Sequence, residues 1–133
     1  MKKIKNIALS LISLIAINGT VAFASNIDRP FTKFSLPANY GNCYSPTQAF
    51  KVNNTNYSYV KPTSMIGTSR VSFWISNTSL QPLTGVIDLP VGSSFNTMYY
   101  YSYPGTNLDV RLSCENAEYS SVNASVTGLV DYD

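Results

Sequence analysis

Residues 71–76 read Val-Ser-Phe-Trp-Ile-Ser, and residues 108–114 read Leu-Asp-Val-Arg-Leu-Ser-Cys. In both stretches apolar residues recur at every second position, so they share one face of an extended chain. A period of two is typical of a half-buried β-strand. The sequence therefore predicts two strands here, with Cys114 on an inward face. Trp74 lies on the face opposite Val71, Phe73 and Ile75, where it is either exposed or buried under a loop or the other sheet layer.

The rest of the chain beyond residue 24 has a similar character. Ser, Thr, Val, Ile and Tyr dominate, good helix formers are scarce, and no stretch has helical periodicity over three turns. Clusters of Gly, Pro, Asn and Ser predict turns at 37–42, 53–54, 62–67, 77–82, 90–94 and 104–105. The strands predicted between them cover 31–36, 47–53, 56–60, 69–76, 84–89, 97–103, 107–114 and 121–131. Because no crossover helix is available for parallel pairing, the predicted fold is all-β, a small antiparallel β-sandwich of jelly-roll or Ig-like type.

The first 24 residues have the pattern of a secretory signal peptide. Three lysines precede a mostly apolar run from Ile7 to Ile17, and Ala22-Phe23-Ala24 supplies small residues for cleavage. The alternative, a membrane anchor, needs about 20 apolar residues, and no second such run follows. We therefore expect a signal peptide over 1–24 and one secreted β-sandwich domain over 25–133, with no membrane span in the mature chain.

Composition excludes several classes of function. The formal net charge is +2, but without Lys2, Lys3 and Lys5 six basic residues face seven acidic ones, which gives −1. A near-neutral surface argues against nucleic acid as a partner. The sequence has no His and two Cys, which excludes Ser-His-Asp triads, His metal sites and Cys₄ zinc sites. No phosphate-binding glycine loop or nucleophile elbow is found, so we expect no cofactor and no metal.

Catalysis by carboxylates needs two acids that face each other across a cleft. The seven acids are Asp28, Asp88, Asp109, Glu115, Glu118, Asp131 and Asp133. Nothing in their spacing sets two of them opposite each other, and a loose calcium site at Asp109, Glu115 or Glu118 lacks the spacing of a calcium loop. We therefore expect no catalytic residues, and a carboxylate-based wall hydrolase stays an alternative.

Cys43 and Cys114 are the only cysteines, and outside the cytosol an even pair predicts a disulfide. The bond would close a loop of 72 residues, for which loop-closure entropy gives roughly 4 kcal/mol of stabilisation. The alternative is two free thiols.

Tyrosines are concentrated between residues 99 and 103. On an extended strand Tyr99, Tyr101 and Tyr103 share one face, and Met98 and Tyr100 share the other. If the first face is exposed, it forms a candidate interaction surface to which Trp74 adds on the same side. If it is buried, the tyrosines only pack across strands.

The segment from Asn56 to Asp133 resembles a family of small secreted proteins of Gram-positive bacteria that is known as a domain of unknown function. The likeness rests on Asn56-Tyr57-Ser58-Tyr59, on Val71 to Ile75, on Val110 to Asn116 and on Ser125 to Gly128. The resemblance implies export and a compact β domain, and it implies no activity. Some members are similar in context to lactococcin-type bacteriocins.

These observations lead to one functional hypothesis. The protein is expected to be secreted and to act without catalysis, by binding a cell-surface polysaccharide or protein. A bacteriocin-like effector is the more specific version of this hypothesis. The alternatives are a cell-wall or glycan-binding module, a structural surface subunit and the hydrolase.

Overall fold

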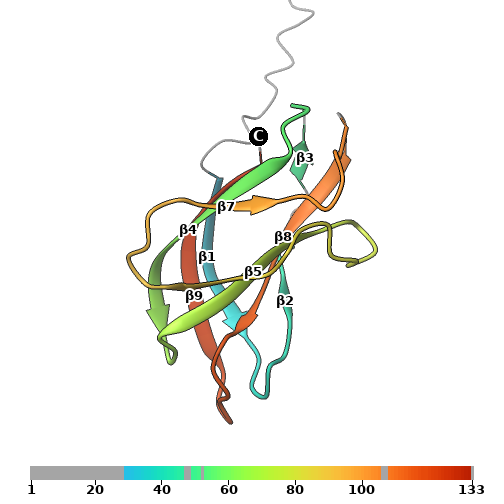
Figure 1. Cartoon of the computed structure of the whole chain (residues 1–133). Helices are drawn as coiled ribbons and strands as arrows, with labels where there is room; N and C mark the ends of the chain where they lie inside the picture. Colours follow the sequence, from blue (N-terminus) through green and yellow to red (C-terminus); the bar gives the residue numbers. More distant parts are fainter. Residues whose placement is uncertain (1–28, 47–48, 52, 106–107, 133) are drawn as a thin grey trace, which may run out of the picture.

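The computed structural model describes residues 29–46, 49–51, 53–105 and 108–132. The expected signal peptide and the first residues of the expected mature domain lie outside the described residues. The described chain folds into two β-sheets that pack against each other (Figure 1).

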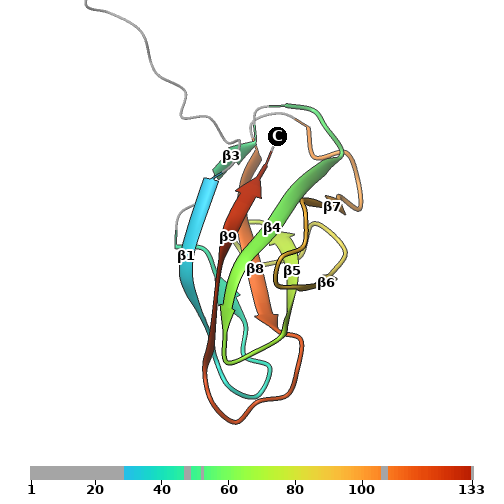
Figure 2. The ribbon, with the colours of Figure 1, turned by 90° about the vertical axis from the view of Figure 1, so that its left-hand side faces the viewer.

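The described residues form nine strands: β1 (Arg29–Leu36), β2 (Cys43–Tyr44), β3 (Ala49–Lys51), β4 (Tyr57–Ile66), β5 (Arg70–Ser76), β6 (Ile87–Pro90), β7 (Asn96–Tyr99), β8 (Leu108–Asn116) and β9 (Ala124–Asp131). Sheet I has the order β1-β9-β4-β7. Sheet II has the order β2-β8-β5-β6, and β3 also pairs with β8. Figure 2 shows β1, β9 and β4 in one layer, with β8 and β5 in the layer behind.

The strand pairs are nested along the chain. β5 pairs with β6, β4 with β7, β2 and β3 with β8, and β1 with β9, and every pair is antiparallel. A long hairpin whose two arms roll up together produces this order, which is that of a jelly roll. The predicted all-β antiparallel sandwich is therefore confirmed, and of the two types left open the pairing matches the jelly roll.

The core lies between the sheets and uses the alternation seen in the sequence. The residues predicted to face inward on the two central strands of sheet II include six that are fully buried: Val71, Phe73, Ile75, Val110, Leu112 and Cys114. The opposite face of β5, for which the sequence left exposure or burial under a loop open, is buried as well. Segment 77–86 runs back along β5, where the Leu83 N–H donates to the Ile75 carbonyl at 2.7 Å.

The turn predicted over 62–67 is wrong, because β4 continues through it to Ile66. Strands accept proline at edges and bulges, where no ladder hydrogen bond is needed from its nitrogen. Pro62 meets both conditions. β7 pairs only with residues 57–60 of β4, and the register between β4 and β9 shifts between Pro62 and Ser64.

Gly128 on β9 occupies the tightest position between two neighbouring strands. It pairs with Phe31 of β1 on one side and with Pro62 of β4 on the other, beside a register shift in each pair. A Cβ atom there would collide with the Lys61 carbonyl oxygen and would lie 2.6 Å from Phe31 Cζ. The Lys61 backbone is held by the pairing of β4 with β9, so an added atom would have to displace a strand and the Phe31 ring.

We therefore expect Gly128→Ala to destabilise the protein by about 1–3 kcal/mol or more, as overpacking does. Gly85→Ala is the matched control, because a Cβ at Gly85 meets nothing within 4 Å. Urea unfolding should show a clearly lower midpoint for the first variant and nearly the parent midpoint for the second. Equal midpoints for the two variants would contradict the register described here.

Candidate functional site

Four aromatic side chains form a contiguous cluster on the outer face of sheet I, here called the aromatic patch: Tyr57, Tyr59, Phe95 and Tyr99. Tyr57 and Tyr59 alternate on β4 with buried residues, and Tyr99 on β7 lies directly opposite Tyr57. Ring centroids are 5.1 Å apart for Tyr57 and Tyr59, and 6.4 Å apart for Tyr57 and Tyr99. The Tyr59 and Phe95 centroids are 6.5 Å apart. These distances indicate direct ring contact, and Tyr99 is 64% exposed.

Charges of both signs border the aromatic patch. Lys61 is the next outward residue of β4, and its Nζ lies 5.7 Å from the centroid of the Phe95 ring. Asp131 on β9 pairs with Tyr59 from the other side. Desolvation raises the pKa of the Tyr59 hydroxyl, and the hydrogen bond with Tyr57 raises it further. The phenol therefore stays protonated, and the patch presents neutral rings between a positive and a negative side chain.

A buried polar network supports the patch from beneath. Ser58 points inward between Tyr57 and Tyr59, and its Oγ lies 2.8 Å from the hydroxyl of Tyr100. Ser58 Oγ also donates to the Tyr132 carbonyl at 3.3 Å. Because Ser58 and Tyr100 are each held from inside, their neighbours along the strands are turned outward.

The sequence predicted Tyr99, Tyr101 and Tyr103 to share one face of a strand, but β7 ends at Tyr99. The Tyr100 N–H donates to the Asn56 carbonyl at 3.1 Å, and the Tyr101 N–H donates to the Leu83 carbonyl at 3.0 Å. The chain thus passes from sheet I toward sheet II at this point. Tyr101 is 71% exposed and Tyr103 74% exposed, but neither makes a ring contact with another described aromatic side chain.

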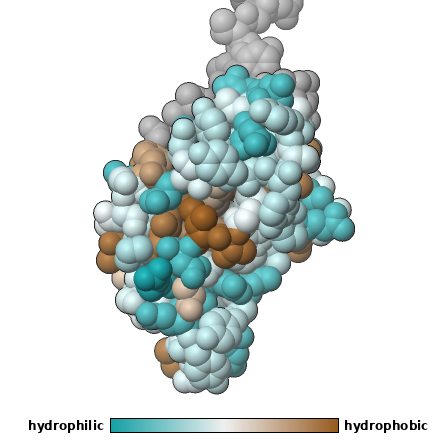
Figure 3. All heavy atoms as spheres, in the orientation of Figure 1, coloured by the Kyte–Doolittle hydropathy of each residue, from teal (hydrophilic) through white to brown (hydrophobic). Residues whose placement is uncertain are grey.

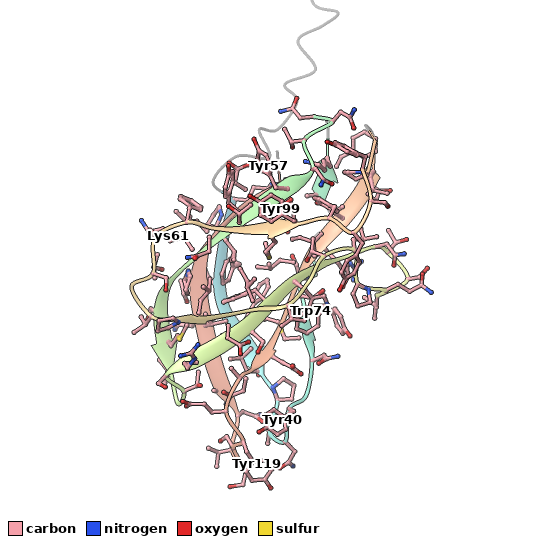
Figure 4. The ribbon with its side chains drawn as sticks, viewed as in Figure 1. Tyr40, Tyr57, Lys61, Trp74, Tyr99 and Tyr119 are labelled. Carbon is pink, nitrogen blue, oxygen red and sulfur yellow. The ribbon has the colours of Figure 1, made fainter. Side chains whose placement is uncertain are left out.

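The expectation that Trp74 adds to the same surface is wrong. Trp74 lies on β5 in sheet II, apart from Tyr57, Tyr99 and Lys61 (Figure 4). Its side chain is only 6% exposed. It lines a hollow of about 310 Å³ on the outer face of sheet II, here called the Trp74 hollow.

Sequence reasoning missed three of the four rings. Tyr57 and Tyr59 fall within the strand predicted over 56–60, and their period of two was the signal that could have found them. Phe95 lies just before β7 and carried no such signal. Only the pairing of β4 with β7 brings these residues to Tyr99.

A second exposed aromatic pair lies at the opposite end of the sandwich (Figure 4). Tyr40 and Tyr119 come from the loops after β1 and after β8, and their ring centroids are 5.8 Å apart. The two loops are tied together by the Asn39 N–H, which donates to the Ser120 carbonyl at 2.8 Å. This pair is smaller than the aromatic patch and is separate from it.

The two cysteines lie directly opposite each other on β2 and β8. Both are free thiols in the structure, with Cys114 buried as predicted and Cys43 half-buried. Opposed residues of antiparallel strands have Cα atoms about 4.5–5.5 Å apart, which suits a disulfide. The hydrogen bond between the thiols lowers the pKa of Cys43, and together with burial it raises the pKa of Cys114. The predicted bond stays a prediction, now with a suitable register.

Two acids that the sequence did not connect lie on one face of sheet II. Asp88 on β6 and Glu115 on β8 both pair with Ser72 of β5, so one strand separates them. Their Cα atoms are about 10 Å apart at the usual strand spacing. Asp88 accepts a hydrogen bond from Ser72 Oγ at 2.6 Å, and only Glu115 of the two lines the Trp74 hollow. No three described His, Cys, Asp or Glu side chains come close enough together to hold a metal ion.

Compared with known proteins, the chain matches no family model, no curated protein and no solved structure. The family resemblance of residues 56–133 therefore stays an expectation. Among the described residues there is no helix of the length and apolar character needed to cross a membrane.

For the cysteines, we expect protein secreted under oxidising conditions to carry a Cys43–Cys114 disulfide. Cys114→Ser should then cost about 2–5 kcal/mol, as removal of a native disulfide does. Adding a reductant should lower the melting temperature of the parent and leave that of the variant unchanged. If an alkylating reagent modifies both cysteines of the native, non-reduced protein, the prediction is wrong.

For Glu115, burial raises the pKa above the ordinary 4.5, and Asp88 raises it further. A carboxyl whose pKa rises on folding favours the folded state when protonated and opposes it when ionised. We therefore expect Glu115→Gln to raise the melting temperature near pH 7, with the difference closing as the pH falls below 4.5. Asp109→Asn, which removes an exposed charge from the same strand, is the control. A variant that melts below both parent and control at pH 7 would refute the prediction.

Proposed function

We propose that this protein is secreted and non-enzymatic, and that it acts by binding another protein through the aromatic patch. The observation that carries the proposal is one continuous group of four aromatic rings outside the core, with Lys61 at its border. Large exposed aromatic clusters mark interaction sites. Tyrosine is favoured there because it offers a large rigid surface and a hydroxyl, and a few such residues supply most of the binding energy.

Ring orientation favours a protein partner over a polysaccharide. The planes of the Tyr57 and Tyr59 rings meet at 53°, those of Tyr57 and Tyr99 at 82°, and those of Tyr59 and Phe95 at 72°. A glycan chain that stacks on several rings needs them nearly coplanar. Tilted rings instead form projections that fit into pockets between side chains of a protein.

Assembly into fibres has less support. The long strand β1 forms one edge of sheet I, where an unpaired backbone would favour addition of another chain. However, β1 carries Pro30 and Lys33 and a register shift between Phe31 and Phe34. Proline, lysine and bulges on an edge strand are features that hinder such pairing.

The signal-peptide pattern of residues 1–24 supports action outside the cell, and a bacteriocin-like effector is one form of this proposal. The hydrolase alternative has less support, because Asp88 lies outside the Trp74 hollow and its carboxylate is bonded to Ser72. Two carboxylates converging on one substrate site are what that chemistry needs.

The test measures binding of fluorescently labelled protein to intact Gram-positive cells. We expect saturable binding that is lost when the cells are treated with protease. The double variant Tyr57→Ser/Tyr99→Ser should bind more than tenfold more weakly, because interface aromatics of this kind contribute about 2 kcal/mol or more each. The double variant should melt close to the parent, since cross-strand aromatic pairs contribute only about 0.2–1 kcal/mol.

Tyr119→Ser is the matched control, since Tyr119 is equally exposed, at 67%, but lies at the other end of the sandwich. Tyr103→Ser tests the interaction surface that the sequence predicted. Binding that survives protease treatment, or a double variant that binds as well as the Tyr119 control, would contradict the proposal.

A further inference from the structure

The Trp74 hollow is built on three neighbouring strands of sheet II, away from the aromatic patch (Figure 4). Tyr44 on β2 pairs with Ser113 on β8, and Ser113 pairs with Trp74 on β5. Directly paired residues point to the same face of a sheet, so two large aromatic side chains flank one small side chain. The hollow has a volume of about 310 Å³, at the lower end of the range for ligand pockets.

Segment 77–86 forms the apolar wall of the hollow. Asn77 Oδ1 accepts hydrogen bonds from the N–H groups of Ser79 at 3.0 Å and Gln81 at 2.9 Å, which turns the chain back toward β5. Three apolar side chains of this segment then line the hollow: Leu80, Pro82 and Val86. Figure 3 shows hydrophobic side chains gathered in the middle of this view, where the segment between β5 and β7 crosses the sandwich in Figure 1.

The indole nitrogen of Trp74 is a hydrogen-bond donor on a side chain that lines the hollow. Buried tryptophans usually donate to a partner. Trp74 is nine-tenths buried, yet its N–H has no acceptor among the described residues. The nitrogen is not among the fully buried side-chain atoms without a hydrogen-bond partner, so it keeps some exposure to solvent. The side chain that carries this donor lines the hollow.

Polar groups of both kinds complete the lining. Asn42 Nδ2 donates to the Tyr44 hydroxyl at 3.1 Å, which leaves the amide oxygen of Asn42 and the hydroxyl proton of Tyr44 for another partner. The Glu115 carboxylate supplies acceptor oxygens on the same lining. The hollow thus offers donors, acceptors and an apolar wall within the space of one small ligand.

We propose that the Trp74 hollow binds one neutral sugar residue. A sugar hydroxyl is both donor and acceptor, so it can accept from the Trp74 N–H and donate to the Glu115 carboxylate. The C–H groups of the ring face the apolar wall. This site lies on the other sheet from the aromatic patch and does not depend on the function proposed for the patch.

Other small ligands fit the lining less well. An acidic sugar would bring its carboxylate toward Glu115, with Asp88 also on this face. Like charges at short range oppose binding. A quaternary ammonium ion suits a carboxylate and aromatic rings, but it has no acceptor for the Trp74 N–H.

Trp74 is the only tryptophan in the chain, so its fluorescence reports directly on the hollow. The test titrates the intact secreted protein with glucose, galactose, mannose and N-acetylglucosamine, with calorimetry as a second readout. We expect a saturable change in fluorescence with at least one of these sugars. Glucuronic acid, which differs from glucose by one carboxylate, should bind at least tenfold more weakly than glucose where glucose binds, and choline should produce no saturable change.

Val86→Lys places a long side chain at the wall of the hollow, and Val91→Lys is its matched control. Val86 is 56% exposed and Val91 is 52% exposed, but only Val86 lines the hollow. We expect the first variant to lose sugar binding at least tenfold and the second to keep it. Binding unaffected by Val86→Lys, equal binding of glucuronic acid and glucose, saturable binding of choline, or no response to any of the four sugars would overturn the proposal.

The aromatic patch and the Trp74 hollow can be tested independently of each other. Tyr57→Ser/Tyr99→Ser should keep the sugar response, and Val86→Lys should keep binding to cells. Release of product from a bound glycan would contradict the non-enzymatic function and leave the binding site in place.

Discussion

Tyr132 joins the two sheets at one end through buried hydrogen bonds. Its carbonyl accepts from Lys51 Nζ of β3 at 2.8 Å and from Ser58 Oγ of β4, and its hydroxyl accepts the Leu112 N–H of β8 at 3.0 Å. Desolvation raises the pKa of the Tyr132 hydroxyl to about 12. Buried polar groups destabilise a fold unless they are paired, so this network is favourable only when both sheets are in place. Lys51, which is fully buried, extends the network to Thr55 Oγ1 at 2.7 Å.

The same network determines which side chains of sheet I face the solvent. Ser58 and Tyr100 must point inward to make their bonds, so Tyr57, Tyr59 and Tyr99 must point outward. A slip of one residue in β4 or β7 would bury the phenol rings and break the buried bonds at once. The position of the aromatic patch therefore follows from the buried hydrogen bonds that Ser58 and Tyr100 make.

Features that depend on alternation within one strand could be predicted from the sequence, whereas features that depend on contacts between segments distant in the chain could not. Residues 71–76 and 108–114 revealed two central strands and the inward direction of Cys114, because a period of two is visible locally. For Trp74 the sequence left open whether the side chain is exposed or buried under a loop, because its cover depends on segment 77–86, which turns back through backbone and side-chain hydrogen bonds of Asn77. The end of β7 at Tyr99 depends on backbone bonds from Tyr100 and Tyr101 to two different partners, and such bonds leave no pattern in the sequence.

The two outer faces of the sandwich differ for a physical reason. On sheet I, β4 and β7 are covered by no further segment of the described chain at the patch, so large side chains there meet solvent. On sheet II, Ser76 and Ser113 join their hydroxyls at 2.8 Å beneath the returning segment, and Thr84 Oγ1 accepts the Ile75 N–H at 3.0 Å. This cover leaves a small hollow with an apolar wall and a few polar groups in place of an open surface. A cluster of projecting rings suits a macromolecule and a small hollow suits a small ligand, so the two proposed partners would bind on separate sheets of the jelly roll.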